Sequence, residues 1–312
     1  MNFFAPIIGQ TKAIELLSSA FANKRLAPAY LFAGAQGIGR ALTARCFSEM
    51  VLSQNIPSSE IPSIQKKILT GNHPDLLWVM PSYLERGQII SIREARAKQL
   101  KRQAAPQVRI EQIRGITEFL SRSPLEASRK LVAIEAAHLM SESAANALLK
   151  TLEEPGKATI ILIAPARSLL PTIISRCQQI PFLPLSRSDL ELVLQQKGYS
   201  EILQHPEILR LANGSPGMAI ESFATLETIS TQLIDSLKQL PKTALEAIKL
   251  AGQINRELEI QTQLWLIDYL QYYYWHHYLG ANLVKQLEKT RQYLLAYVQP
   301  RLVWETTLLS FC

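Results

Sequence analysis

The chain has 312 residues, of which 47% are hydrophobic and 19% are charged, a balance that fits folded domains and excludes a disordered chain. At roughly 100–200 residues per domain, this length predicts two or three domains. The 33 Lys and Arg residues against 26 Asp and Glu residues give a net charge of +7, which permits an acidic partner such as nucleic acid but does not establish one. No apolar run reaches the roughly 18 residues of a membrane span, and no basic segment precedes an apolar one at the N-terminus, so we expect a cytoplasmic protein without membrane contact.

Short apolar runs along the first half of the chain predict buried strands at 29–33, 76–80, 131–134 and 159–163. None of these runs alternates polar and apolar residues, which is typical of strands buried on both faces of a parallel sheet. Helical spacing of apolar residues predicts helices from Arg40 to about Leu52, from Ile110 to Leu120, and from Ser141 to a stop at Pro155 and Gly156. We expect loops at 53–63 and 103–106. The alternation of strands and helices predicts an α/β layer over the first 183 residues or so.

The character of the sequence changes after Pro184, where Ser186 to Asp189 can cap a helix and the pattern is helical to the end. The run Gly214-Ser215-Pro216-Gly217 interrupts this helical part. We therefore predict an α/β domain over 1–184, a small helical domain over 185–223 and a larger helical domain over 224–312.

A glycine-rich segment, Gly34-Ala35-Gln36-Gly37-Ile38-Gly39, lies between the first predicted strand and the helix that begins at Arg40. This is the context of a phosphate-binding loop, in which glycines let backbone N–H groups turn toward phosphate oxygens at a helix N-terminus. A working loop ends in Lys and then Ser or Thr, whose hydroxyl binds Mg²⁺, but Arg40 and Ala41 stand here. The residues leave two interpretations open: a tight turn with no ligand, or a loop that binds nucleotide weakly.

The groups that would hydrolyse a nucleotide are also missing. The strand 131–134 ends in Glu135 and Ala136, where an ATPase would place an Asp that holds the metal and a Glu that activates water. Glu135 could reach a metal, but Ala136 cannot activate water. We therefore expect no ATP hydrolysis by this chain.

Arg176, in the run Ser175-Arg176-Cys177, could act as an arginine finger that reaches the γ-phosphate bound by a neighbouring subunit. A lone arginine is more commonly a solvated surface residue, so the residues alone do not decide between these roles. If Arg176 does act on a neighbour, its side chain should be partly exposed rather than buried in an ion pair of its own domain.

Several short motifs occur in the order found in one family. Ile7-Ile8-Gly9-Gln10, Gly71-Asn72-His73-Pro74-Asp75, Glu111-Gln112-Ile113-Arg114, the run from Ala144 to Pro155, and Ser175-Arg176-Cys177 together resemble the bacterial clamp-loader branch of AAA+ proteins. Within that branch, the combination over about residues 4–220 is similar to the delta-prime subunits of DNA polymerase III.

This resemblance implies an AAA+ P-loop type parallel-sheet domain, a small helical lid and an all-α C-terminal collar that joins subunits in a ring. It implies partners of the gamma/tau and delta types and, through the complex, the sliding clamp and primed DNA. It also implies a subunit of the polymerase holoenzyme with no independent enzymatic activity, in which Arg176 acts in trans as the catalytic arginine of a neighbouring ATP site. The four residues of the degenerate phosphate loop that correspond to cofactor-binding positions are Gly34, Gly37, Gly39 and Arg40. The γ-phosphate sensor of active relatives is replaced by Ile163 and Ala164.

The chain departs from the family in one respect. Clamp-loader modules of this type commonly carry a four-cysteine zinc site, whereas the stretch 46–71 holds only Cys46, with His73 nearby. Because a structural zinc needs four ligands, we expect no zinc or other bound metal.

Two other features admit a DNA-binding interpretation beside a structural one. A basic stretch comprises Arg93, Arg96, Lys98, Lys101, Arg102, Arg109 and Arg114, and an aromatic stripe comprises Tyr269, Tyr272, Tyr273 and His276. A solvated helix face and helix packing are the favoured explanations. The alternatives to a non-hydrolysing subunit are therefore a gamma/tau-type ATPase, which Arg40, Ala41 and Ala136 disfavour, and a DNA-binding module driven by the positive charge.

Overall fold

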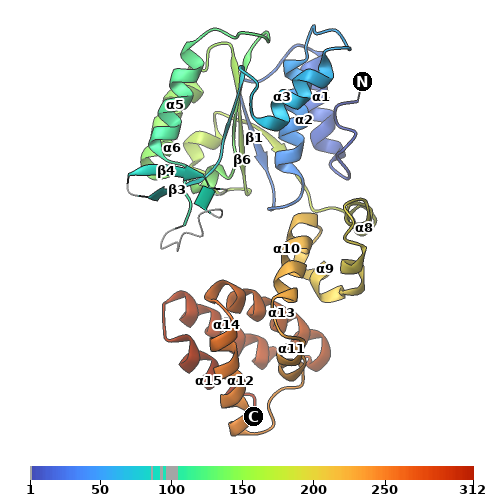
Figure 1. The fold of residues 1–312 in the computed structure, drawn as a ribbon, viewed down its shortest axis with the longest axis vertical. Coiled ribbons are helices and arrows are strands. Elements are labelled where there is room, and N and C mark those ends of the chain that lie inside the picture. The colour runs from blue at the N-terminus through green and yellow to red at the C-terminus, as the bar shows by residue number, and fades with distance from the viewer. Residues whose placement is uncertain (1, 86, 92–93, 96–104) are drawn as a thin grey trace. The chain divides into compact units, whose positions relative to one another are not determined.

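A computed structural model describes residues 2–85, 87–91, 94–95 and 105–312. The chain divides into two compact units, one ending at Ser186 and the other running from Arg187 to Cys312 (Figure 1). The first predicted boundary, near 184, lies close to this division. The second, near 224, falls inside the second unit, and the division into lid and collar stays a prediction.

The first unit is built on a parallel sheet whose strand order is β2-β5-β6-β1-β7. The strands are β1 (Ala29–Ala33), β2 (Leu76–Val79), β5 (Lys130–Ile134), β6 (Ala158–Ala164) and β7 (Gln178–Pro181). The first four coincide with the predicted apolar runs, so the expected parallel α/β layer is confirmed. The sequence did not predict β7, which is an edge strand with exposed glutamines.

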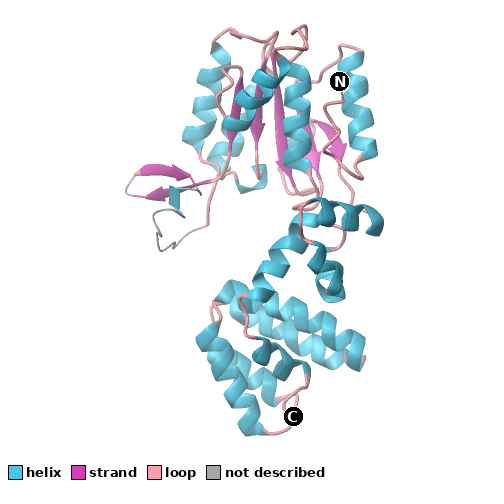
Figure 2. Cartoon of the chain, turned by 45° about the vertical axis from the view of Figure 1, so that its right-hand side comes forward, coloured by secondary structure: helices cyan, strands magenta, loops and turns pink. Residues whose placement is uncertain are grey.

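Helices cover both faces of this sheet (Figure 2). On one face, Tyr30 and Phe32 of β1 pack in a core with α1 (Thr11–Ala22), α2 (Arg40–Leu52) and α3 (Ile61–Thr70). On the other, Leu31 packs in a core with α5 (Ile110–Ser121) and α6 (Glu142–Glu153). Because successive strand residues point to opposite faces, a continuous apolar run is what a sheet covered on both sides requires.

Smaller elements complete the first unit. The hairpin β3 (Ser82–Glu85) and β4 (Gln88–Ser91), which the sequence did not predict, forms a separate antiparallel sheet. The short helices η1 (Ala137–Leu139) and α7 (Pro171–Ile174) follow β5 and β6. The loop predicted over 53–63 is shorter than expected, because α3 begins at Ile61. Pro62 lies in the first turn of that helix, where proline is tolerated. In the loop predicted over 103–106, residues 103–104 lie outside the described residues.

The second unit, all of which the structure describes, contains helices and no strand. They are α8 (Arg187–Gln196), η2 (Ser200–Gln204), α9 (Pro206–Ala212), α10 (Pro216–Glu227), α11 (Thr231–Lys238), α12 (Ala244–Glu257), α13 (Ile260–Tyr278), α14 (Ala281–Leu295) and α15 (Pro300–Leu309). The largest fully buried side chain here is Trp304, whose indole N–H donates to Gln263 at 2.9 Å. Tyr269 of the aromatic stripe is buried in the same core, which favours helix packing over base stacking for that residue.

Candidate functional site

The glycine-rich segment forms a tight turn between β1 and α2. Gly37 and Gly39 have φ angles of 74° and 100°, a region that residues with a Cβ rarely adopt. Gly34 lies so close to the chain after β7 that an added Cβ would stand 2.6 Å from the Phe182 carbonyl oxygen. The glycines therefore preserve the shape of a phosphate loop at the N-terminus of α2.

Arg40, the first residue of α2, is almost completely buried, with 8% of its surface exposed. Its Nη1 atom has no hydrogen-bond partner among the described residues. Burial lowers the pKa of Arg40, and the nearby Glu135 carboxylate opposes that shift. A buried cation without a full set of partners is costly, so Arg40 is held at the loop by packing and long-range attraction rather than by a closed ion pair.

The ends of β5 and β6 meet the loop from the side. The Gly34 N–H donates to the Ala164 carbonyl at 3.3 Å, which places the predicted sensor position directly beside the first glycine. Glu135 follows β5 and accepts a hydrogen bond from the Trp78 indole N–H at 3.0 Å. Ala136 has a positive φ of 49°. Parallel strands end at the same edge of a sheet, where ligands of such folds bind, so the structure brings the predicted loop, metal and sensor positions together.

The side chains at this edge lack the oxygen atoms that a metal-bound nucleotide needs. Ala41, Ala136 and Ala164 carry only methyl groups. The nearest hydroxyl along α2, that of Thr43, is fully buried and donates to the Gly39 carbonyl at 3.0 Å. The loop therefore keeps its backbone shape without the side chains that bind Mg²⁺ or activate water.

Gln10 fixes the loop to the end of the sheet, a role that the sequence did not reveal. This side chain is 3% exposed and donates to the Ile38 carbonyl at 3.1 Å and to the Leu183 carbonyl at 2.8 Å. Its oxygen accepts from the Leu183 N–H at 3.2 Å. Because both ends of the carboxamide are used, Gln10 acts here as an internal clamp.

Arg176 lies just after the one-turn helix α7, away from the burial that surrounds Arg40. Its side chain is 36% exposed, which agrees with the expected partial exposure, but it also forms an ion pair within its own unit. The Nε and Nη2 atoms donate to Glu153 Oε1 at 3.1 and 2.6 Å, and Nη1 donates to the Thr172 carbonyl at 3.0 Å. The sequence did not predict this pair with Glu153, which is itself 52% exposed at the end of α6. Among the described residues, no hydrogen bond or ion pair joins Arg176 to the phosphate loop.

Cys46 and His73, the two residues considered as zinc ligands, each have a structural environment of their own. Within the described ranges, no three metal-ligating side chains come together. Cys46 is buried in α2, and burial raises the pKa of its thiol to about 11. His73 is also buried, and its Nδ1 accepts from the Asp75 N–H at 3.1 Å. Asp75 in turn accepts three backbone N–H groups, from Leu125, Glu126 and Ala127, each at 2.7 Å. The His73-Pro74-Asp75 motif therefore organises the chain before β5.

The structure describes only Arg109 and Arg114 of the basic stretch. Arg93, Arg96, Lys98, Lys101 and Arg102 lie outside the described residues. Arg109 stands at the N-cap position of α5, where its backbone N–H donates to Gln112 Oε1 at 3.0 Å. This contact uses the backbone of Arg109 and not its guanidinium.

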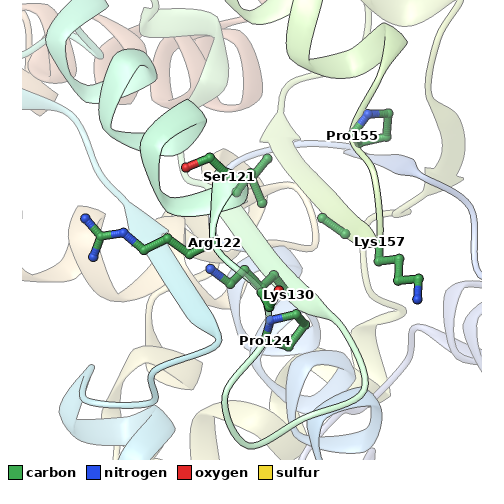
Figure 3. A pocket seen from close by; sticks show the side chains of 9 residues that line it. Ser121, Arg122, Pro124, Lys130, Pro155 and Lys157 are labelled. Carbon is green, nitrogen blue, oxygen red and sulfur yellow. The ribbon is translucent and has the colours of Figure 1, made fainter.

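A cavity of about 220 Å³ lies where α5 ends and β5 and β6 begin (Figure 3). Three cations line it, Arg122, Lys130 and Lys157, which suggests an anion site at first sight. However, Arg122 is paired with Glu118 at 2.6 Å, Lys130 Nζ donates to the Phe119 carbonyl, and Figure 3 shows Lys157 pointing away from the other two cations. The cavity therefore lacks a convergent set of donors.

Comparison with known families decides between the clamp-loader alternatives. A model described as DNA polymerase III, delta subunit, matches residues 9–186, and a model described as cyanobacterial DNA polymerase III delta prime, C-terminal domain, matches residues 188–311. The chain belongs to the DNA polymerase III delta-prime family. The Pseudomonas aeruginosa delta-prime subunit is 30% identical over 284 residues, which cover 86% of this chain and 79% of that one.

Other proteins are also similar to this delta-prime family member. The Bacillus subtilis delta-prime subunit is 35% identical over 186 residues, or 58% of this chain and half of that one. The tau subunit of the same organism is 30% identical over 181 residues, which cover 57% of this chain and 29% of the tau subunit. A gamma subunit-related protein of Thermotoga maritima has the same fold, with a TM-score of 0.52 and 18% identity over 96% of this chain and 98% of that one.

Among the described residues, no helix is both long and apolar enough to cross a membrane.

Proposed function

We propose that this chain works in the cytoplasmic clamp loader without hydrolysing ATP, and that it supplies Arg176 to the ATP site of an adjacent gamma/tau-type subunit. Its partners would be gamma/tau-type and delta-type subunits and, through the complex, the sliding clamp and primed DNA. One contrast carries the proposal. The phosphate loop lacks the side-chain oxygens that catalysis needs, whereas Arg176 lies at the surface and has N–H groups that its own chain does not use.

The lack of hydrolysis follows from the side chains at the sheet edge. A nucleotide-bound Mg²⁺ needs the hydroxyl that Ala41 lacks, and the attacking water needs the carboxylate that Ala136 lacks. Thr43 does not substitute, because its hydroxyl is buried and bonded within α2. A gamma/tau-type subunit that hydrolyses its own ATP would need both groups.

The role of Arg176 follows from electrostatics. Phosphoryl transfer spreads negative charge over the γ-phosphoryl oxygens, and a guanidinium from a neighbouring subunit stabilises that charge. A guanidinium has five N–H groups, and Arg176 uses three of them within its own chain. The remaining two, one on each Nη atom, have no partner among the described residues. They suit a bidentate contact with phosphate oxygens, which lysine cannot make.

The experiment reconstitutes the loader from this chain and gamma/tau-type and delta-type subunits, and measures ATP hydrolysis and clamp loading. Arg176→Ala should leave assembly intact, lower total turnover in part, because other sites keep their own fingers, and lower clamp loading more. Arg176→Lys should not restore full activity. Arg122→Ala is the matched control, since Arg122 is also a surface arginine paired with a glutamate at 2.6 Å in the same unit.

Two results would overturn the proposal. Unchanged hydrolysis and loading with Arg176→Ala would remove the trans role. Steady-state hydrolysis by the isolated chain, abolished by Arg40→Ala, would instead make the chain an ATPase of the gamma/tau type.

We further propose that the chain holds neither zinc nor a tightly bound nucleotide. The raised pKa of Cys46 supports this for zinc, because the thiolate is the form that binds metal. Metal analysis of the purified chain should give well under one zinc per chain. One zinc per chain that is lost on mutation of Cys46 and His73 would contradict the proposal.

A further inference from the structure

We infer that Glu153 is a positioning residue that holds the Arg176 guanidinium in the orientation needed to reach a neighbour's phosphate. This inference rests on the function proposed above for Arg176. Glu153 belongs to α6 and Arg176 follows α7, and the contact joins two residues that lie 23 positions apart in the sequence.

The contact with Glu153 uses the Nε–Nη2 edge of the guanidinium. Glu153 Oε1 accepts from both Nε and Nη2, while the Thr172 carbonyl accepts from Nη1. With Nε and one N–H of each Nη bound, the plane of the group is fixed. The two N–H groups that remain without a partner in the described chain therefore belong to different Nη atoms, and both can donate to phosphate oxygens.

Both ends of the contact are mounted on anchored elements. Leu148 and Leu152, which precede Glu153 on α6, are buried in the core beside the sheet, and Ile173 of α7 is buried in the same core. These side chains fix the backbone that carries the carboxylate and the backbone that carries the arginine. The geometry of the pair is therefore set by the fold of one unit.

Helix stability alone does not explain a glutamate at this position. Glu153 is the last residue of α6, and Glu154 follows it, at the end of a helix where negative charge is disfavoured. An exposed ion pair also contributes little to stability. Such a weak contact can be given up or shared when a phosphate arrives, yet it still restricts the rotamers of a flexible arginine before that event.

The test adds Glu153 variants to the reconstituted loader and measures ATP hydrolysis against ATP concentration. The quantity to follow is the hydrolysis that depends on Arg176, namely the difference between the unmodified loader and the Arg176→Ala loader. Glu153→Ala should lower this quantity roughly three- to tenfold, as expected for lost preorganisation of one side chain. The KM for ATP should not change, since the finger acts on the transition state.

Three further variants make the readout specific. With Glu153→Gln, the Arg176-dependent hydrolysis should lie between that of the unmodified chain and that of Glu153→Ala, because an amide oxygen still accepts hydrogen bonds. Glu153→Ala combined with Arg176→Ala should behave as Arg176→Ala alone. Glu118→Gln is the control, since it removes the carboxylate of another surface Arg–Glu pair, with Arg122, and should have no effect.

The outcomes separate this inference from the proposed function. If Arg176→Ala lowers hydrolysis and Glu153→Ala does not, the inference fails and the proposed function stands. If Glu153→Ala raises hydrolysis, or adds a loss in the Arg176→Ala background, Glu153 restrains the finger or acts elsewhere, and the inference also fails. If Arg176→Ala itself has no effect, the proposed function fails first.

Discussion

The phosphate loop and the Arg176 segment lie in the same unit but hold their arginines in opposite ways. Arg40 is 8% exposed and has an Nη1 atom without a partner among the described residues, so its charge is enclosed. Arg176 has a 36% exposed side chain and is held by the Glu153 carboxylate on its Nε–Nη2 edge and by the Thr172 carbonyl at Nη1. A charge that is enclosed can serve only its own domain, whereas a charge presented at the surface can serve a neighbour.

This difference also separates the shape of a site from its chemistry. Gly34, Gly37 and Gly39 form a turn that a nucleotide-binding loop requires, although Ala41 and Ala136 beside it carry no oxygen in their side chains. Backbone geometry is part of how β1, α2 and the chain after β7 pack together, so it can persist without a ligand. The groups that serve chemistry alone, such as a hydroxyl for Mg²⁺, have no such structural role and can be lost.

The largest loss in the free energy of unfolding should come from replacing Asp75, a buried carboxylate that has its hydrogen-bond partners. Asp75 is therefore the residue with which to compare Arg40. Asp75 is fully buried and accepts three backbone N–H groups at 2.7 Å. Asp75→Ala should lower the free energy of unfolding by about 3 kcal/mol or more, since hydrogen bonds to a charged group contribute about 1.5–3 kcal/mol each and three amides would lose their partner. Denaturant unfolding measures this. A loss below about 1 kcal/mol would show that water replaces the carboxylate easily.

Arg40 should behave in the opposite way. Arg40→Met keeps the buried length of the side chain and removes the enclosed charge, so the free energy of unfolding should stay within about 1 kcal/mol of its original value or rise. The same unfolding experiment applies. A loss of about 3 kcal/mol or more would mean that the guanidinium is bound by a partner and would weaken the contrast between the two arginines.

Arg176 should matter little for the stability of its own chain. Its pair with Glu153 is partly exposed, so Arg176→Ala should change the free energy of unfolding by less than about 1 kcal/mol. Thermal or denaturant unfolding of the isolated chain is sufficient. If the variant unfolds, Arg176 is a structural residue and its effect on the loader cannot be assigned to catalysis.

The smallest expected effect is a change in the pKa of His138, which lies in η1 after β5. The pKa of His138 is lowered first by burial and then by the positive charge of Arg40. In Arg40→Met the second cause disappears, so the pKa of His138 should rise while burial still keeps it below the ordinary value. An NMR titration of the imidazole follows this directly. An unchanged or lower pKa would place the Arg40 charge farther from this edge of the sheet.

The sequence predicted the parts of the fold that depend on burial. The runs that became β1, β5 and β6 are apolar throughout because helices cover both faces of the sheet. By contrast, β7 (Gln178–Pro181) escaped prediction, since an edge strand needs no apolar run and tolerates a proline. The hairpin β3–β4 escaped for a related reason, because Leu84 and Ile89 remain exposed and mark no buried face.

Of the candidate site, the sequence predicted only the features formed by neighbouring residues and not the contacts between residues far apart in the chain. The spacing of the glycines indicated a turn at a helix N-terminus, and the turn is present. The clamp by Gln10 joins residues 173 positions apart, and the contact of Glu153 with Arg176 joins two elements whose distance depends on the packing of α6 and α7. Single-sequence patterns carry no signal for such contacts, because each partner alone is an ordinary polar residue.

The most direct test of the central claim counts ATP molecules hydrolysed in a single round by the assembled loader. Pre-steady-state hydrolysis, started by primed DNA and sliding clamp, should show a fast phase whose amplitude falls by one ATP per loader when this chain carries Arg176→Ala. The rate of the remaining fast phase should stay close to that of the unmodified loader, and Arg122→Ala should leave the amplitude unchanged. An Arg176→Ala loader with the same amplitude and rate as the unmodified one would show that no neighbouring site depends on this arginine, and would contradict the account.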